Sequence, residues 1–357
     1  MIGKLLSNIL QTRAGAAPAA PAPPDALPLS SAIPAAAGMP SAVPVVGVPV
    51  AENERDAFLR RKAYEHSTAQ LWLMAQQLQQ ALLADPKYDD PARLERHGWK
   101  SYSQNDEDGI LAEIFRRIGV AHRSFVEFGC DDGLENNTSY LLAQGWRGLW
   151  IDGADVNATL VRQGFAHLIE RGLLQFRQDF IDRDNIDGMI AAAGLGPEID
   201  LLSIDLDGND YHLWEAIRSV NPRVVVIEYN AKFRPPMDWC MAYLREHIWS
   251  GDDVMGASLT ALTRLGEARG YQLVGCNLTG ANAFFVRQDL AGDRFARPAS
   301  AEHLYQPPRY SLIYAYRGGH GASSLAIVQG ACLTLGLPVP TSAQLGSTVK
   351  PDLPDPS

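Results

Sequence analysis

The chain has 357 residues, and 31 Lys and Arg against 41 Asp and Glu give it a formal net charge of −10. This length suffices for one large domain or two small ones with tails. No run of five or more basic residues occurs, which excludes the electrostatic footprint of a general nucleic-acid binder. No stretch reaches the roughly 18 consecutive apolar residues that a membrane span requires.

Composition marks the two ends of the chain. Alanine and proline supply 21 of the first 50 residues without periodicity. Such a stretch buries too little apolar surface to offset its ordering entropy, so residues 1–52 are expected to be a disordered tail. Helical spacing of apolar residues predicts a helical N-terminal extension over 53–100. The main domain is expected at 101–320, followed by a largely disordered C-terminal extension, 321–357.

The cysteines are scattered along the chain and form no C-x-x-C pair. They are Cys130, Cys240, Cys276 and Cys332. Neither a disulfide framework nor a zinc site is expected from this spacing, and the predicted location is the reducing cytoplasm.

The main domain alternates short apolar runs with helical periodicity, which is typical of an open α/β sheet with helices on both faces. Seven strands are expected, at 124–128, 148–151, 174–178, 201–205, 224–228, 271–276 and 283–286. Helices are expected at 110–118, 137–144, 156–171, 186–193, 211–219 and 258–269. The nearly continuous apolar runs at 201–204 and 224–227 indicate central parallel strands. Only six residues, 277–282, join the last two strands, so the sheet is expected to end in an antiparallel hairpin.

The first two expected strands end in a pattern that indicates a nucleoside site. Gly129 follows the first strand directly, and Gly133 closes a short loop, where the absence of a Cβ lets a ligand approach the backbone. Asp152 ends the second strand nineteen residues after Gly133. An acidic residue at this spacing forms hydrogen bonds with the ribose hydroxyls in nucleoside-binding α/β folds.

The loop favours S-adenosylmethionine over a dinucleotide. A dinucleotide loop has the pattern G-x-G-x-x-G, whereas this chain has Glu127, Gly129 and Gly133 in the order E-x-G-x-x-x-G. Asp131 and Asp132 lie inside the loop and would repel a pyrophosphate, but they suit a cofactor with a cationic sulfonium and an ammonium. The competing interpretation is a tight turn with two ordinary surface aspartates.

A second group of acids follows the fourth and fifth strands, at Asp205, Asp207, Asp210 and Glu228, with Asn230 nearby. Open α/β sheets place their ligands at these strand ends. One interpretation is a general base with a carboxylate that orients the acceptor. Another is a Mg²⁺ site that acidifies a hydroxyl, and a third is that Asp205 only caps the following helix.

Five motifs then carry a resemblance to a known family. They are SQNDEDGI at 103–110, VEFG at 126–129, WIDG at 150–153, IDLDGND at 204–210 and IEYN at 227–230. The region from about 103 to 317 resembles the class I S-adenosylmethionine-dependent methyltransferases, and within them the FkbM-type branch and its relatives. The resemblance implies a Rossmann-like seven-stranded, mostly parallel sheet of order 3-2-1-4-5-7-6 with a C-terminal antiparallel hairpin. Asp207 stands where the family's usual motif has Glu.

The resemblance also implies roles for individual residues. The cofactor-binding set is Gln104, Glu127, Gly129, Gly133, Asp152, Gly153, Asp179, Phe180 and Asp205. Within it, Glu127 and Gly129 line the methionine end, Asp152 binds the ribose, and Asp179 and Phe180 contact adenine. The catalytic set is Asp207, Glu228 and Asn230. A divalent cation is an alternative that the spacing of Glu228 and Asn230 disfavours, since it departs from the Asp-Asn pair of catechol-type enzymes.

The family is associated with methylating sugar hydroxyls, so the expected function is an O-methyltransferase acting on a glycan or a glycosylated small molecule. The alternative is a non-catalytic scaffold or partner protein of the same fold in surface-glycan assembly. The concentration of acids at one rim favours the enzyme, because an inert descendant has no reason to keep them together.

Overall fold

The computed structural model describes residues 70, 73–249 and 253–310. Expectations for the tail 1–52, for residues 53–69 and for 311–357 therefore fall outside the described residues. Of the predicted N-terminal extension, residues 73–83 are helical, and two 3-10 helices follow, η1 (Pro86–Asp89) and η2 (Glu95–His97). Within the described residues, no helix combines the length and apolarity needed to cross a bilayer.

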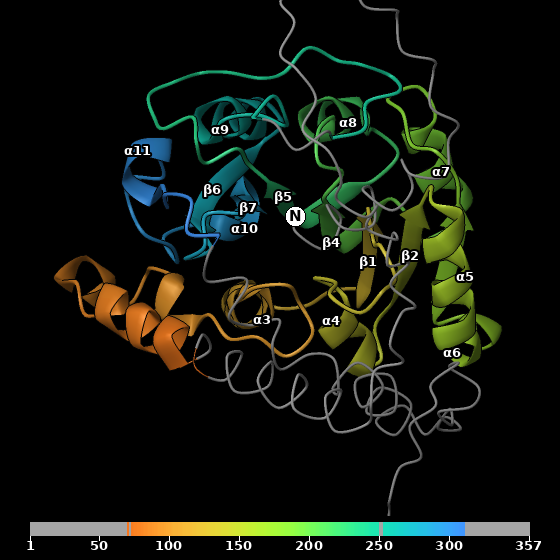
Figure 1. The fold of residues 1–357 in the computed structure, drawn as a ribbon, viewed down its shortest axis with the longest axis horizontal. Coiled ribbons are helices and arrows are strands. Elements are labelled where there is room, and N and C mark those ends of the chain that lie inside the picture. Colours follow the sequence, from red (N-terminus) through yellow and green to blue (C-terminus); the bar gives the residue numbers. More distant parts are fainter. Residues whose placement is uncertain (1–69, 71–72, 250–252, 311–357) are drawn as a thin grey trace, which may run out of the picture. The chain divides into compact units, whose positions relative to one another are not determined.

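Seven strands form a single sheet of order β3-β2-β1-β4-β5-β7-β6 (Figure 1). The strands are β1 (Ser124–Phe128), β2 (Arg147–Asp152), β3 (Leu174–Gln178), β4 (Glu198–Ile204), β5 (Asn221–Glu228), β6 (Tyr271–Cys276) and β7 (Asn282–Arg287). The first five are parallel, and β7 runs antiparallel to both β5 and β6. The predicted fold, a Rossmann-like sheet ending in an antiparallel hairpin, is confirmed.

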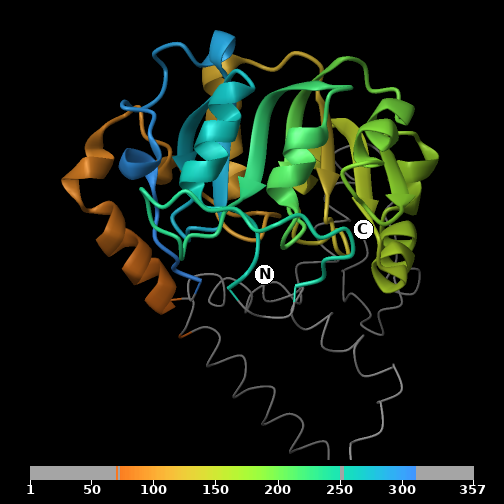
Figure 2. The same cartoon turned by 90° about the horizontal axis from the view of Figure 1, so that it is seen from above.

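Helices cover both faces of the sheet, as Figures 1 and 2 show. One face carries α3 (Glu107–Ile118), α4 (Ser139–Ala143), α5 (Asp155–Gly164) and α6 (Ala166–Glu170); the other carries α7 (Ile186–Ala192), α8 (Asp210–Ala216) and α9 (Leu259–Ala268). Short helices α10 (Gln288–Ala291) and α11 (Ala301–Leu304) follow β7. Because successive side chains of a strand point to opposite faces, Phe125 packs with the α3–α6 layer and Val126 with the α7–α9 layer.

Some helix boundaries differ from the prediction. The single helix expected at 156–171 is two helices, α5 and α6, which meet at Phe165. The Phe165 ring packs edge-on against Trp150 of β2, with centroids 4.8 Å apart. Helix α3 begins at Glu107, three residues before the predicted start, and β4 ends at Ile204, so Asp205 lies just beyond the strand.

A buried polar network fastens the segment before α3 to the segment after α11. Gln306 accepts a hydrogen bond from the Tyr88 hydroxyl (3.0 Å) and donates one to Glu95 (2.8 Å). Its backbone carbonyl accepts from the hydroxyl of Tyr229, which follows β5 directly, at 2.6 Å. Arg93 forms a buried ion pair with Glu95 at 2.9 Å. These contacts fix the surroundings of the β5 tip.

Candidate functional site

The backbone at the end of β1 lies close against the backbone at the end of β4, at Gly129 and Asp205. Gly129 has a φ of +74°, and a Cβ at this position would lie 1.6 Å from the carbonyl oxygen of Asp205. At Gly133, with φ +86°, a Cβ would meet the rings of Phe165 and Trp150 at 2.6 and 2.9 Å. Both positions therefore require glycine for the packing of the chain itself. Contact of these two glycines with a cofactor stays a prediction.

Glu127 organises the glycine loop from inside the protein. Its buried carboxylate accepts hydrogen bonds from the backbone N–H of Asn137 (3.0 Å) and from the Thr138 hydroxyl. The side chains of Asn136 and Ser203 donate to it as well, at 3.2 Å each. Burial raises its pKa, and these donors oppose the rise. The carboxylate predicted to face the cofactor thus holds the start of α4 in place.

Asp152 joins the β2 tip to the same loop. Its carboxylate accepts from the backbone N–H of Asp131 (3.0 Å), from that of Ala154 (2.9 Å) and from the Asn157 side chain (3.2 Å). Asp131 has a φ of +50°, a conformation rarely adopted by residues other than glycine. Asp152 thereby fixes the loop conformation at the position where a ribose is expected.

The positions predicted to contact adenine lie at the surface next to Asp152. Phe180 is 47% exposed, which is unusual for a phenyl ring, and Gly153 is exposed beside it. A Cβ on Gly153 would lie 3.4 Å from the carbonyl oxygen of Asp179. The Asp179 carboxylate pairs with Arg177 at 2.9 Å. An accessible aromatic face bordered by a glycine suits a planar heterocycle.

The turn that precedes α3 is held by hydrogen bonds to Asp108, one of the acidic side chains of the motif at 103–110. Asp108 accepts three backbone hydrogen bonds, from Ser101, Tyr102 and Ser103, at 2.6–3.0 Å. Gln104, predicted to contact the cofactor, is half-buried, and its carbonyl accepts from Lys100 at 2.8 Å. Burial raises the pKa of Asp108 to about 6, against the effect of its backbone donors. The turn is a rigid support for the start of α3.

Glu107 reaches the β6–β7 hairpin, a link that the sequence did not suggest. Its Oε1 accepts from the side chains of Asn277 and Asn282, both at 2.8 Å, and from that of Asn105 at 2.9 Å. Asn282 pairs with Glu228 across the β5–β7 ladder. The three successive acids 106–108 were the available signal, but the hairpin partners of Glu107 lie 170 and 175 residues further along the chain.

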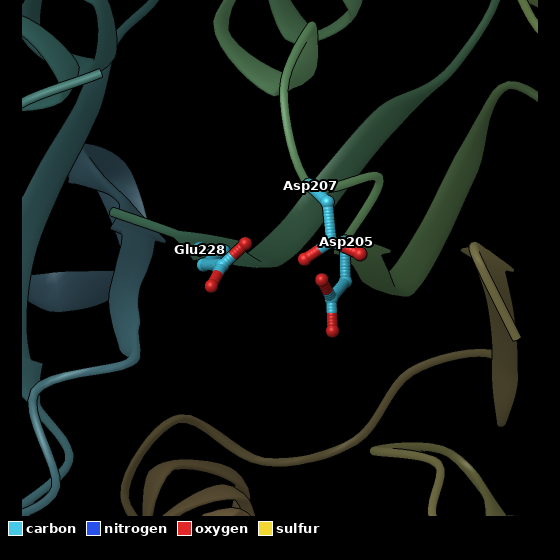
Figure 3. A group of neighbouring side chains, drawn as sticks. All are labelled: Asp205, Asp207 and Glu228. Atoms are coloured by element: carbon cyan, nitrogen blue, oxygen red, sulfur yellow. The ribbon is translucent and has the colours of Figure 1, made fainter. Parts of the chain in front are cut away.

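Three carboxylates converge at the tips of β4 and β5, as Figure 3 shows. We call Asp205, Asp207 and Glu228 the acidic cluster; one oxygen of each lies within 4.8 Å of those of the other two. Asp207 and Glu228 are only 5% and 6% exposed. Oε2 of Glu228 is buried and has no hydrogen-bond partner. Burial raises the pKa of Glu228 well above its usual range, and the charges of Asp205 and Asp207 raise it further.

Asp210 shapes the loop that carries Asp207. Its carboxylate accepts from the backbone N–H groups of Leu206 and Gly208, both at 2.8 Å. The loop places Asp207 in the left-handed region, with φ +56°. Such backbone strain persists only where its surroundings enforce it, as they do at ligand sites. Burial, followed by the charge of Asp205, raises the pKa of Asp210 to about 6.

The side chain of Asn230, predicted to be catalytic, forms hydrogen bonds with the loop that follows β5. Its Nδ2 donates to the carbonyl oxygens of Asp253 (2.9 Å) and Met255 (3.1 Å), and its Oδ1 accepts from the backbone of Lys232 (3.2 Å). The amide therefore tethers the insertion between β5 and α9. Its participation in the reaction stays a prediction. His212 of α8 likewise binds this insertion, through the Met241 carbonyl at 2.8 Å.

The chemical character of the side chains at these strand ends suits S-adenosylmethionine. The exposed Phe180 ring suits an adenine ring, and Asp152 beside it offers a carboxylate at the ribose position. The acidic cluster has the charge that a cationic sulfonium and ammonium need. No basic residue occupies the glycine loop, Gly129 to Gly133, where a pyrophosphate would need one.

Comparisons with known proteins return partial likenesses among solved structures. No protein-family profile matches the sequence, and no curated protein matches it. An O-methyltransferase from Bacillus cereus in complex with SAH is 15% identical with a TM-score of 0.34, covering 60% of this chain and 89% of that chain. A glycopeptide N-methyltransferase complexed with S-adenosyl-L-methionine is 13% identical with a TM-score of 0.33, covering 50% and 92%. An S-adenosylmethionine-dependent methyltransferase from Clostridium acetobutylicum is 10% identical with a TM-score of 0.33, covering 52% and 92%. The fold assignment itself rests on the strand order of this chain.

Proposed function

We propose that this protein is an S-adenosylmethionine-dependent O-methyltransferase that acts on a sugar hydroxyl of a glycan or of a glycosylated small molecule, in the cytoplasm. The observation that carries the proposal is the acidic cluster at the tips of β4 and β5. It lies on the same edge of the sheet as the β1 and β2 tips, near which the Asp152 carboxylate and the exposed Phe180 ring are found.

Two neighbouring groups of residues have separate roles: one binds the cofactor and the other acts on the acceptor hydroxyl. Phe180 covers the adenine and Asp152 accepts from the ribose, while Asp205 stands at the boundary with the acceptor. When bound, the cofactor supplies a methyl group on a positively charged sulfur. Asp207 and Glu228 attract the hydroxyl of the acceptor and favour loss of its proton as its oxygen forms the new bond to carbon. Proton removal of this kind typically accelerates a reaction about 10²- to 10⁴-fold.

The acceptor side is formed by an insertion rich in aromatic and apolar residues, between β5 and α9. Phe233 and Trp239 stack there with ring centroids 4.2 Å apart and an interplanar angle of 29°. Flat aromatic surfaces pack well against the apolar faces of sugar rings. This is the support for a carbohydrate acceptor.

Cofactor binding is the first test. Titration calorimetry should detect S-adenosylmethionine binding and no NAD binding. Asp152→Ala should weaken binding by roughly tenfold to a hundredfold, because a hydrogen bond to a charged group contributes about 1.5–3 kcal/mol. Asp155→Ala, three residues further along the chain, is the matched control and should bind like the wild type.

Methyl transfer is the second test. Incubation with methyl-labelled cofactor and cell-surface glycan extracts should transfer label to the carbohydrate fraction. Binding of the cofactor without any transfer would support the non-catalytic scaffold instead. An unchanged dissociation constant for Asp152→Ala would remove the ribose assignment.

A further inference from the structure

We propose that Asp205, Asp207 and Glu228 bind one hard divalent cation, of the Mg²⁺ or Ca²⁺ type, at the tips of β4 and β5. The inference deepens the proposed function and rests on it for the role of the cation in catalysis. The binding site itself is argued from the geometry and burial of the three side chains (Figure 3).

The spacing of the carboxylates suits one oxygen-liganded ion. Mg²⁺ binds oxygen at about 2.0–2.1 Å and Ca²⁺ at about 2.3–2.6 Å, so oxygens on opposite sides of either ion are about 4–5 Å apart. The three ligand oxygens of Asp205, Asp207 and Glu228 all lie within 4.8 Å of one another. All three donors are carboxylates, the oxygen ligands that such cations prefer.

The burial of Glu228 provides an independent indication. Its Oε2 lies in the protein with no hydrogen-bond partner, and the residue is 6% exposed. A buried carboxylate oxygen without a donor is costly, and native proteins rarely keep one unless a ligand completes it.

The kind and number of donors distinguish a divalent ion from other cations. All three side chains that meet within 4.8 Å end in carboxylates, and Asp207 and Glu228 are largely buried. A hard divalent cation takes six or more oxygen ligands, whereas an ammonium group offers three hydrogen-bond donors.

A cation at this position would bind the acceptor oxygen and lower the pKa of its hydroxyl group. The hydroxyl proton then leaves to solvent, and a lone pair of the oxygen forms the new O–C bond. The S–C bond of the sulfonium breaks with its electron pair remaining on sulfur, so the products are a methyl ether and a neutral thioether.

The experiment measures metal binding on the full-length protein without cofactor or acceptor. Mn²⁺ serves as the probe, followed by electron paramagnetic resonance, with Mg²⁺ calorimetry at constant ionic strength. We expect one Mn²⁺ per chain with a Kd below about 1 mM. Glu228→Gln and Asp207→Asn should each weaken binding at least about tenfold. Glu170→Gln, at an exposed position of α6, is the matched control and should bind like the wild type.

Thermal unfolding verifies that the variants fold and adds a signature that a structural role would not produce. Glu228→Gln replaces the carboxyl group by an amide of nearly the same shape, so its metal-free form should remain folded. Mg²⁺ should raise the melting temperature of the wild type and not that of the variant. Absence of Mn²⁺ binding by the wild type, or equal Mn²⁺ binding by wild type and both variants, would overturn the inference.

Calorimetry with S-adenosylmethionine separates this inference from the proposed function. If the cofactor binds and Mn²⁺ does not, the metal site is wrong and the methyltransferase proposal stands. If Mn²⁺ binds and the cofactor does not, the metal site stands and the methyltransferase proposal fails. If Glu228→Gln abolishes cofactor binding and the wild type binds no Mn²⁺, the cluster holds the cofactor's ammonium and the metal inference is overturned.

Discussion

Asp106 is a buried acid outside the acidic cluster. It is 3% exposed, and its buried carboxylate is approached by the backbone N–H groups of Asp106 itself and of Leu278. Burial raises its pKa to about 7, and the neighbouring charge of Glu107 adds to this. The carboxyl group also fills the space next to Gly98, where a Cβ would lie 2.5 Å from its Oδ2. Asp106 therefore keeps its proton at pH values where an ordinary aspartate is ionised.

This residue predicts how stability depends on pH. The folded protein holds the Asp106 proton up to about pH 7, whereas the unfolded chain loses it near 3.8. The stabilisation is therefore complete below pH 3.8 and is lost as the pH rises to about 7. Asp106→Asn cannot ionise, so its stability relative to the wild type should increase by about 2–3 kcal/mol between pH 5 and pH 8.

Urea denaturation at both pH values measures this difference. Asp184→Asn, at an exposed aspartate, should follow the wild type throughout. A constant difference between Asp106→Asn and the wild type would show that Asp106 does not titrate in this range.

The positions of the site acids could be predicted from the sequence, but their partners could not. Strand tips and alternation place Asp205, Asp207 and Glu228 at one rim, and the structure brings these three together. Asn230 was expected beside Glu228 on the same argument. Its side-chain N–H groups donate to two carbonyls of an insertion more than 20 residues away, and no local pattern encodes that contact. Glu127 accepts from residues of the loop that follows β1, and its contact with a cofactor stays a prediction.

At the level of elements, the link between α3 and the β6–β7 hairpin positions the candidate site. Glu107 at the first turn of α3 accepts from Asn277 and Asn282 on the two sides of the hairpin turn. The same Asn277 side chain accepts from the backbone N–H groups of Ala281 and Asn282, both at 2.9 Å. Because Asn282 is paired with Glu228, this link supports the β5 tip.

Removal of this link between α3 and the hairpin should strongly destabilise the folded protein. Glu107→Ala leaves several buried donors unsatisfied, so we expect a loss of at least about 3 kcal/mol in the free energy of unfolding. Glu107→Gln retains an acceptor oxygen and should lose less. Glu302→Ala, at an exposed position of α11, should change stability by no more than about 0.5 kcal/mol. Equal stability of Glu107→Ala and wild type in urea would contradict the role given to this residue.

Strands were easier to predict than helices. The apolar runs of β1, β4 and β5 are buried on both faces, so their composition alone identifies them. The break between α5 and α6 depends on Phe165, whose ring packs on Trp150 of a neighbouring layer. Helical periodicity continues through this residue, so only the tertiary contact reveals the break.

At the scale of the whole molecule, the sequence predicts that residues 1–50 are dispensable for the fold. Their alanine- and proline-rich composition offers no periodic apolar face to pack. A chain lacking residues 1–50 should melt within about 2 °C of the full-length protein, and it should bind S-adenosylmethionine equally well. A large fall in melting temperature or affinity on truncation would show that the segment docks on the main domain.

The position of β7 has a consequence for synthesis on the ribosome. β7 lies between β5 and β6 in the sheet although it is the last strand along the chain, and Asn282 in it pairs with Glu228, 54 positions earlier (282 − 228). At about 5–20 residues per second, the nascent chain presents an open β5 edge for roughly 3–11 s after Glu228 is made. The hydrogen bond from the Tyr229 hydroxyl forms later still, because its acceptor is the backbone carbonyl of Gln306. The rim of the candidate site is thus enclosed only when nearly all of the domain has emerged, so prematurely terminated chains should lack binding activity altogether.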